Sequence, residues 1–135
     1  MASNQHQFIL GLINRKIFEY GFSIVFLDGK VSGAFHQKFK FPPSILRHRP
    51  DVIGINENGY ICIGEAKTKN DLFNKRTKEE FLDFSNYEIN GKSCLLIIGI
   101  PSSSYNDLNI LLNKLELHNN SNIEILSIPD EIINE

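Results

Sequence analysis

The stretch Pro50–Lys67, PDVIGINENGYICIGEAK, decides how the chain is interpreted. Two short runs rich in apolar residues, 51–56 and 60–67, lie on either side of Glu57-Asn58-Gly59. Apolar, β-branched runs around an Asn-Gly turn are typical of a β-hairpin. The stretch therefore predicts two antiparallel strands joined by a tight turn.

The length of that turn determines which side chains share a face of the sheet, because directly paired residues project from the same side. A two-residue turn would pair Asp51 with Ala66 and leave Asp51 on the face away from Glu65. A three-residue turn, with Gly59 in the left-handed conformation, would pair Asp51 with Glu65 instead. The sequence permits both turns.

Glu65 and Lys67 are two residues apart in a strand, so they point to the same face, and Ala66 points to the other. With the three-residue turn, Asp51 joins them. Two carboxylates and an ammonium group meet the needs of phosphodiester hydrolysis, which uses oxygen ligands for Mg²⁺ and a cation near the attacking water. The alternative is a structural salt bridge between Glu65 and Lys67.

The rest of the chain predicts alternating helices and strands. Apolar spacing, turn residues and β-forming runs mark the expected elements. They are a helix over 4–20, a strand over 22–27, a strand and loop over 30–49, the hairpin, a helix over 77–87, a strand over 93–100, a helix over 105–117 and a strand over 123–128. This order predicts one α/β domain over residues 1–135, with a mixed β-sheet flanked by helices.

Composition is that of a globular protein: 135 residues, 41% hydrophobic and 22% charged. No apolar run approaches the roughly 20 residues of a membrane span, and residues 1–7 are polar, so we expect a cytoplasmic protein. Cys62 and Cys94 each lie in an apolar run without metal-binding spacing and are expected to be reduced core residues.

Charge is distributed unevenly along the chain. Ten basic and four acidic residues lie between Lys30 and Lys78, a net charge of +6 within a chain whose formal charge is −2. The remainder therefore carries −8. A polyanion would approach the middle segment, although a solvated surface explains the charges equally well.

The string from Pro50-Asp51 to Glu65-Ala66-Lys67 resembles the PD-(D/E)xK signature of restriction-endonuclease-like nucleases, which include Holliday-junction resolvases and related phage and repair nucleases. The element order from about residue 4 to 128 is similar to that fold. The resemblance implies a Mg²⁺- or Mn²⁺-dependent DNA nuclease that acts as an endonuclease, with exonuclease activity as the alternative. In it, Asp51 and Glu65 would bind the metal with the Ala66 carbonyl, and Lys67 would assist the attacking water.

The chain departs from the family pattern in its first helix. Many members carry a glutamate in the middle of that helix, where this chain has Leu10, Gly11 and Leu12. Glu19, the helix's own acidic residue, is a candidate fourth ligand, with Gln5 or Gln7 as alternatives. The number of metals therefore stays open.

Several basic residues near the hairpin are candidates for nucleic-acid contacts. They are Lys38, Lys40, Arg47, His48, Arg49 and Lys69. A solvated loop histidine and a surface lysine are the ordinary alternatives for His48 and Lys69. Tyr87 could face substrate or pack in the core, and the second triplet, Asp28-Gly29-Lys30, is disfavoured because it contains a turn glycine.

One such active site cuts one strand at a time, so cleavage of a duplex or junction predicts a homodimer or larger assembly on DNA. The alternatives are a catalytically silent copy of the fold that binds DNA or assembles with other subunits, and an RNA nuclease.

Overall fold

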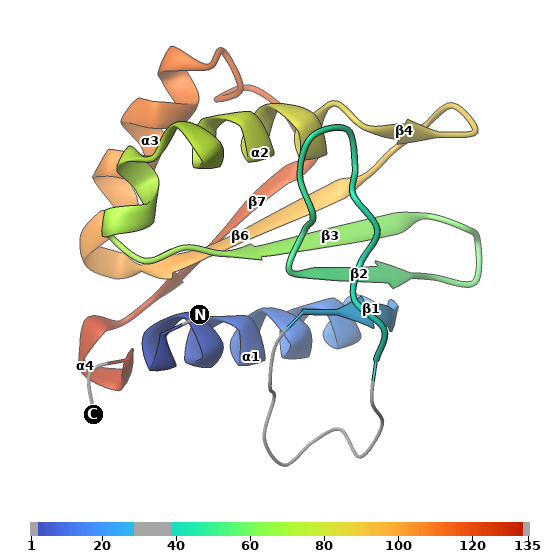
Figure 1. Ribbon diagram of the computed structural model, residues 1–135, viewed down its shortest axis with the longest axis horizontal. Helices are drawn as coiled ribbons and strands as arrows, with labels where there is room; N and C mark the ends of the chain where they lie inside the picture. The colour runs from blue at the N-terminus through green and yellow to red at the C-terminus, as the bar shows by residue number, and fades with distance from the viewer. Residues whose placement is uncertain (1–2, 29–38, 134–135) are drawn as a thin grey trace.

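A five-stranded mixed sheet forms the centre of the computed structural model, which describes residues 3–28 and 39–133 (Figure 1). The strands lie in the order β1-β2-β3-β6-β7. Pairing is antiparallel from β1 to β3 and parallel from β3 to β7. Their bounds are β1 Ser23–Leu27, β2 Val52–Ile55, β3 Ile61–Ala66, β6 Leu95–Pro101 and β7 Ile123–Ile128.

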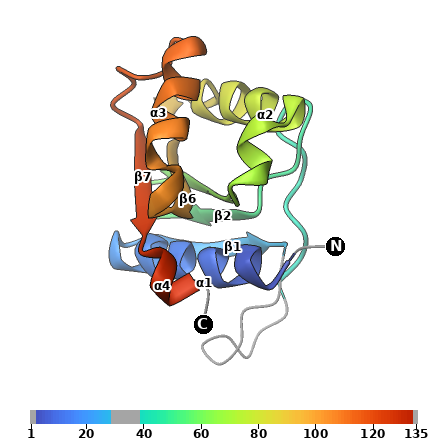
Figure 2. The same ribbon diagram turned by 90° about the vertical axis from the view of Figure 1, so that its left-hand side faces the viewer.

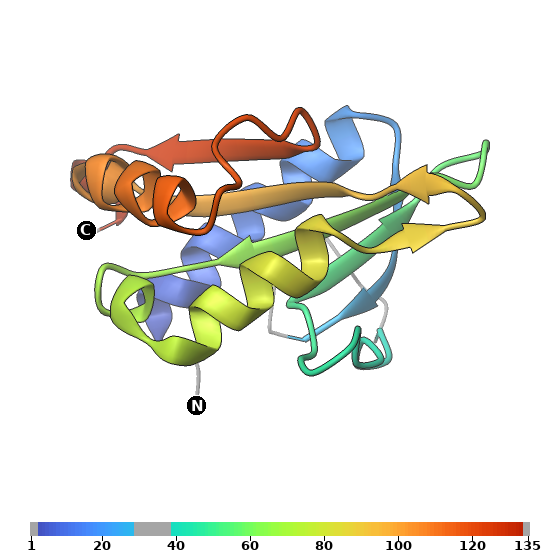
Figure 3. The same cartoon turned by 90° about the horizontal axis from the view of Figure 1, so that it is seen from above.

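Helices cover both faces of this sheet, which confirms the expected fold class. Helix α1 (Asn4–Glu19) lies on one face, and α2 (Lys75–Ser85) and α3 (Tyr105–Lys114) lie on the other (Figure 2). Figure 3 looks onto the face that α2 and α3 cover, with α1 behind the sheet. The smaller elements are η1 Asn70–Phe73, η2 Ser102–Ser104, α4 Asp130–Ile133 and the two-stranded hairpin of β4 Glu88–Ile89 and β5 Lys92–Ser93. In the described part of the chain no helix is long and apolar enough to cross a membrane.

Helix α1 forms where the sequence places its caps. The Ser3 side chain accepts a hydrogen bond from the backbone N–H of His6, which satisfies a free donor of the first turn. Gly21, after the helix, has a φ of 87°, a left-handed conformation that glycine adopts without strain. The apolar side of the helix is buried against the sheet through Ile9, Leu10, Ile13 and Ile17.

Two apolar clusters hold the layers together, one on each face of the sheet. Helix α1 packs with Val52, Cys62 and Ala66, while α2 and α3 pack with Ile63 and the alternate residues of β6. Cys62 and Cys94 are both free and buried, as expected. Burial raises the pKa of the Cys62 thiol to about 12 and that of Cys94 to about 11, so both stay protonated.

The hairpin adopts the three-residue turn. Val52 pairs with Gly64 and Ile55 with Ile61. The Asn56 N–H donates to the Tyr60 carbonyl at 3.0 Å, and Gly59 has a φ of 82°. Continuing this register by one residue places Asp51 opposite Glu65. The register that assembles the three charged residues is therefore confirmed.

Differences from the predicted elements lie mainly at their ends. Helix α2 begins two residues earlier and ends two residues earlier than the predicted 77–87. The β4–β5 hairpin was not predicted, although Asn90 and Gly91 both have positive φ values and form its turn. Helix α4 was missed because four residues carry too little periodicity.

Residues 30–38 of the predicted strand and loop over 30–49 lie outside the described residues. Residues 41–49 form the loop expected at the end of this segment, with an isolated bridge between Ile45 and His48. Pro42-Pro43 explains this, because proline cannot donate to a strand ladder.

Candidate active site

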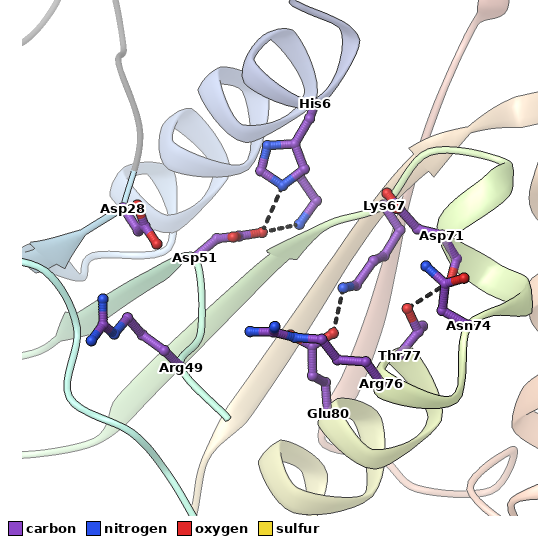
Figure 4. A pocket seen from close by; sticks show the side chains of 11 residues that line it. His6, Asp28, Arg49, Asp51, Lys67, Asp71, Asn74, Arg76, Thr77 and Glu80 are labelled. Carbon is purple, nitrogen blue, oxygen red and sulfur yellow. Dashed lines mark hydrogen bonds and ion pairs between the residues drawn. The ribbon is translucent and has the colours of Figure 1, made fainter. Parts of the chain in front are cut away.

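A polar cavity of about 320 Å³ lies at the carboxyl end of β3, between the N-terminal turn of α1 and helix α2 (Figure 4). Ligands of open α/β sheets commonly bind at this end of the strands. Charged and polar side chains line most of it: His6, Asp28, Arg49, Asp51, Lys67, Asp71, Asn74, Arg76, Thr77 and Glu80, together with Ala66.

Asp51 and Glu65 are locked together by reciprocal hydrogen bonds. The Asp51 N–H donates to Oε2 of Glu65 at 2.6 Å, and the Ala66 N–H donates to Oδ2 of Asp51 at 2.9 Å. Each carboxylate therefore binds the backbone of the opposite strand. This arrangement depends on the three-residue turn, since a shift by one residue would send Asp51 to the other face.

Glu65 is the most deeply buried charged group of the site, with 1% of its surface exposed. Its Oε1 makes no hydrogen bond, although the Lys67 Nζ lies 3.3 Å away. Burial and the nearby Asp51 carboxylate raise the pKa of Glu65 well above its ordinary value, and Lys67 opposes this. Lys67 therefore compensates the negative charge of the carboxylate pair only in part.

Lys67 lies between two carboxylates. Its Nζ is 2.5 Å from Oε1 of Glu80, on α2, and 3.3 Å from Oε1 of Glu65. Burial lowers the pKa of Lys67, but Glu65 and Glu80 outweigh burial and raise it above the ordinary lysine value. Lys67 is therefore a fixed cation at neutral pH. Arg76, one turn before Glu80, lies 3.8 Å from Oε2 of Glu80.

His6 approaches the same carboxylates from α1. Its Nε2 is 3.2 Å from Oδ2 of Asp51. The hydrogen bond with Asp51 is the largest influence on its pKa and raises it, against an opposing effect of burial. The sequence signal that could have drawn attention to His6 is its place at the third residue of the helix, where a capping box carries Glu or Gln.

The donor set suits a hard divalent cation, but it is not closed around one. As they stand, no three His, Cys, Asp or Glu side chains of the described residues form a group that could hold a metal ion. Mg²⁺, however, is commonly held by one or two carboxylates, with water and phosphate completing its shell. The buried Glu65 Oε1 without a hydrogen bond, beside a second carboxylate, fits such a cation.

A comparison with solved structures matches a repair endonuclease from Pyrococcus abyssi. The match has a TM-score of 0.49 and 18% sequence identity, and it covers 96% of this chain and 48% of that one. The chain thus spans about half the length of that protein. No family model and no curated protein matches the sequence.

Of the predicted nucleic-acid contacts, the structure brings Arg49 to the cavity, where its guanidinium lies over the Phe41 ring. Lys40 and Lys69 are exposed but do not line it, and Lys38 lies outside the described residues. Tyr87 packs against the core of α2 and α3 rather than facing the cavity.

Arg47 and His48 bind the protein itself. The Arg47 guanidinium donates to Asp83 at 2.7 and 3.2 Å, and His48 Nε2 lies 2.8 Å from Oε1 of Glu79. Both acidic residues lie on α2. Neither residue lines the cavity, and their side chains attach the loop before Asp51 to this helix, so their DNA contacts stay predictions.

Glu19, the candidate fourth ligand, is remote from the cavity. It lies at the C-terminal end of α1 and does not line the cavity, whereas His6 is in the first turn. Thirteen helical residues separate the two, or about 20 Å along the axis. The helix contributes His6 to the site in place of an acidic residue.

Proposed function

We propose that the protein is a divalent-metal-dependent nuclease that hydrolyses phosphodiester bonds in DNA, with Asp51, Glu65 and Lys67 at its active site. The observation that carries the proposal is the hydrogen bond from Asp51 to the buried, incompletely compensated Glu65, two residues from Lys67 on the same face of the sheet. Asp51, Ala66 and Lys67 line a water-accessible cavity, and Glu65 is buried behind them. The resemblance of the same residues to the PD-(D/E)xK signature supports it.

In this mechanism Asp51 and Glu65 hold the cation, and the Ala66 carbonyl is a further candidate ligand. When bound, Mg²⁺ or Mn²⁺ polarises the phosphate and lowers the pKa of a water molecule. Lys67 donates hydrogen bonds to the attacking water or to the developing negative charge. Glu80 keeps the Lys67 side chain in place by accepting a hydrogen bond from Nζ.

The charges that line the cavity support a requirement for a divalent cation when phosphate binds there. Four acidic residues, Asp28, Asp51, Asp71 and Glu80, face three basic ones, Arg49, Lys67 and Arg76. Buried Glu65 adds a further acid behind them. A phosphate group would be repelled here unless a divalent cation entered with it. Arg49 and Arg76 are then suited to the neighbouring phosphates, because guanidinium groups bind phosphate in a bidentate manner.

The decisive experiment is cleavage of linear, circular, branched and single-stranded DNA, with an RNA substrate alongside, in Mg²⁺, in Mn²⁺ and in EDTA. We expect metal-dependent cutting that Asp51→Ala and Lys67→Ala abolish. Glu57→Gln is a matched control, because Glu57 is exposed at the opposite end of the same hairpin. Cutting that survives either alanine substitution would refute the assignment.

A catalytically silent DNA-binding or assembly subunit is the second candidate. It is favoured by the lack, among the described residues, of three side chains already grouped to hold a metal. That function predicts that the native chain binds DNA but does not cut it in any metal. Lys67→Ala should likewise bind DNA without cutting it. Preferred cutting of RNA would instead assign the same chemistry to an RNA nuclease.

A further inference from the structure

An exposed aromatic side chain lies beside the cavity. Phe41 has 65% of its surface exposed, although phenylalanine is usually a buried residue. Cζ of the Arg49 guanidinium lies 5.7 Å from the centre of the Phe41 ring, within the range of a cation–π contact. Arg49 also lines the cavity, and in Figure 4 it and Lys67 lie on opposite sides of Asp51. The ring and the cavity are therefore joined through Arg49.

The backbone on both sides holds Phe41 at the surface. On one side, the Lys40 carbonyl accepts a hydrogen bond from the Leu27 N–H of β1 at 3.0 Å. On the other side, Pro42 is buried, and a residue that precedes proline is restricted to extended conformations. Phe41 thus lies between two anchored neighbours. A ring that is already fixed loses little conformational entropy when a ligand binds to it.

The charges around Phe41 indicate which ligand the ring suits. Lys40 and Arg49 are both exposed, the first next to Phe41 in the chain and the second in contact with its ring. Cations beside an exposed aromatic ring are the combination that binds single-stranded nucleic acid, since the cations attract phosphates and the ring stacks on a base. An apolar partner would instead have to desolvate both cations without pairing them.

We propose that Phe41, together with Arg49, is a stacking site for an unpaired base next to the scissile phosphate. The inference rests on the proposed function, because it takes the cavity as the place where that phosphate binds. In a duplex both faces of a base are covered by its neighbours, so a side chain stacks only on a base that is unpaired or has left the helix. The protein should therefore prefer single-stranded DNA, or the single-stranded part of a branched DNA, over an intact duplex.

DNA binding in Ca²⁺ tests the proposal, with gel electrophoresis to verify that the DNA stays intact. Fluorescence anisotropy gives the affinities for a labelled single strand and for the duplex of the same sequence. We expect the native chain to bind the single strand more tightly. Phe41→Ala should weaken single-strand binding by about tenfold, which is the usual loss for one stacked base, and should change duplex binding little.

Three further variants make the result specific. Phe41→Leu keeps an apolar side chain without a ring and should lose as much affinity as Phe41→Ala. Phe41→Trp keeps a stacking surface and should retain single-strand binding. Phe18→Ala is the matched control, because Phe18 is 71% exposed but lies roughly 18 Å along the α1 axis from His6 of the cavity, and it should bind like the native chain. Circular dichroism verifies the fold of each variant.

Photocrosslinking locates the stacked base. A single strand that carries 5-iodouracil at successive positions is irradiated in the complex, and mass spectrometry identifies the attached residue. We expect attachment to Phe41 from a base that adjoins the phosphate cut in Mg²⁺ or Mn²⁺. Attachment to Phe41 only from bases remote from the cut would refute the placement.

The outcomes separate this inference from the proposed function. If Phe41→Ala binds the single strand as tightly as the native chain, the stacking site is refuted, whereas metal-dependent cutting that Asp51→Ala abolishes leaves the proposed function standing. Equal losses for single strand and duplex would also refute stacking, because they would show that Phe41 acts by holding Arg49. If single-strand binding depends on Phe41 and the native chain cuts no DNA in any metal, the nuclease function fails and the ring stands as part of a DNA-binding surface.

Discussion

Glu80 shows how a single residue outside the sequence motif can complete a site. Its side chain is 4% exposed, and its Oε1 lies 2.5 Å from Nζ of Lys67. A buried lysine with a flexible stem needs a partner to keep one position. Glu80 provides it from α2, on the far side of Lys67 from the strand pair. We therefore regard Glu80 as a positioning residue.

Replacement of Glu80 should lower kcat with little change in KM, because Lys67 would act mainly in the transition state. We expect Glu80→Ala to reduce kcat by about 100-fold, which is the usual effect of a displacement near 1 Å. Glu80→Gln retains an acceptor for the Lys67 ammonium and should recover much of this loss. Steady-state kinetics on a cleaved DNA substrate give both constants.

Glu79→Gln is the matched control, since the neighbouring residue binds His48 and not Lys67. It should leave kcat nearly unchanged. A rise in KM without a fall in kcat in Glu80→Ala, or equal losses in the alanine and glutamine variants, would argue against positioning of Lys67.

At the level of elements, the close approach of α1 to the sheet depends on two glycines. A Cβ added at Gly99 would lie 2.7 Å from Cδ1 of Ile13 and 2.8 Å from Cγ2 of Ile9. At Gly64 it would lie 2.6 Å from Cγ2 of Ile13. Both positions therefore require a residue without a side chain. The same packing brings the first turn of α1, and with it His6, to the carboxyl end of β3.

Gly99→Ala should destabilise the protein by about 1–3 kcal/mol, the usual effect of overpacking a filled core. Gly11→Ala is the control, because a Cβ there meets nothing within 4 Å. That change should be neutral or stabilise the helix by roughly 0.5–1 kcal/mol. Urea unfolding at 25 °C measures both, and equal stabilities of the two variants would contradict the packing argument.

A second contact between elements ties the loop before Asp51 to α2 through Arg47 and Asp83. Burial would raise the pKa of Asp83, but hydrogen bonds and charge from Arg47 outweigh burial and lower it below its ordinary value of 3.8. A carboxyl group whose pKa is lowered by folding stabilises the protein above its unfolded pKa. This contribution is lost as the pH falls through the folded pKa.

Arg47→Ala should therefore be less stable than the native chain at pH 7, and the difference should shrink as the pH falls below about 4. Thermal unfolding between pH 2.5 and 7 measures the difference. Lys78→Ala removes an exposed cation of α2 that does not pair with Asp83 and serves as the control. A difference that persists unchanged at the lowest pH would show that Arg47 acts by packing alone.

Over the whole molecule, the basic segment expected to attract a polyanion is partly neutralised by folding. Lys67 and Arg76 pair with Glu80, and Arg47 pairs with Asp83. The cations of the middle segment are thus used to hold the structure together as well as to face the cavity. Bulk positive charge is then a weak source of DNA affinity.

DNA binding should accordingly depend on divalent ions. We expect Ca²⁺, which also takes oxygen ligands, to raise the affinity for DNA by at least about tenfold over EDTA at equal ionic strength. Asp51→Ala should lose this enhancement, whereas Glu57→Gln should keep it. Fluorescence anisotropy measures the affinities. An enhancement that Asp51→Ala retains would place the DNA-bound ion outside this cavity.

Duplex cleavage should require two copies of the chain, because one site of this kind cuts one strand. Analytical ultracentrifugation of a catalytically inactive variant, alone and bound to duplex DNA, should reveal a dimer or larger assembly. Monomers alone in both conditions, together with cutting of both strands, would contradict this expectation.

The sequence by itself determined the hairpin and the three charged residues on it. Glu57-Asn58-Gly59 is a local turn signal, and strand alternation places Glu65 and Lys67 on one face whatever else the chain does. The sequence allowed two registers for Asp51, and the folded hairpin has the one that pairs it with Glu65. Local patterns also predicted most helices and strands, with errors at their ends.

Only the tertiary structure decided which other side chains reach this hairpin. His6 is 45 residues before Asp51, and Glu80 comes from a helix on the opposite face of the sheet from α1. Arg47 and His48 turned to α2 rather than to the cavity. Such contacts depend on how whole layers pack, and no local spacing encodes them, because the layers meet through apolar side chains distributed over the entire chain.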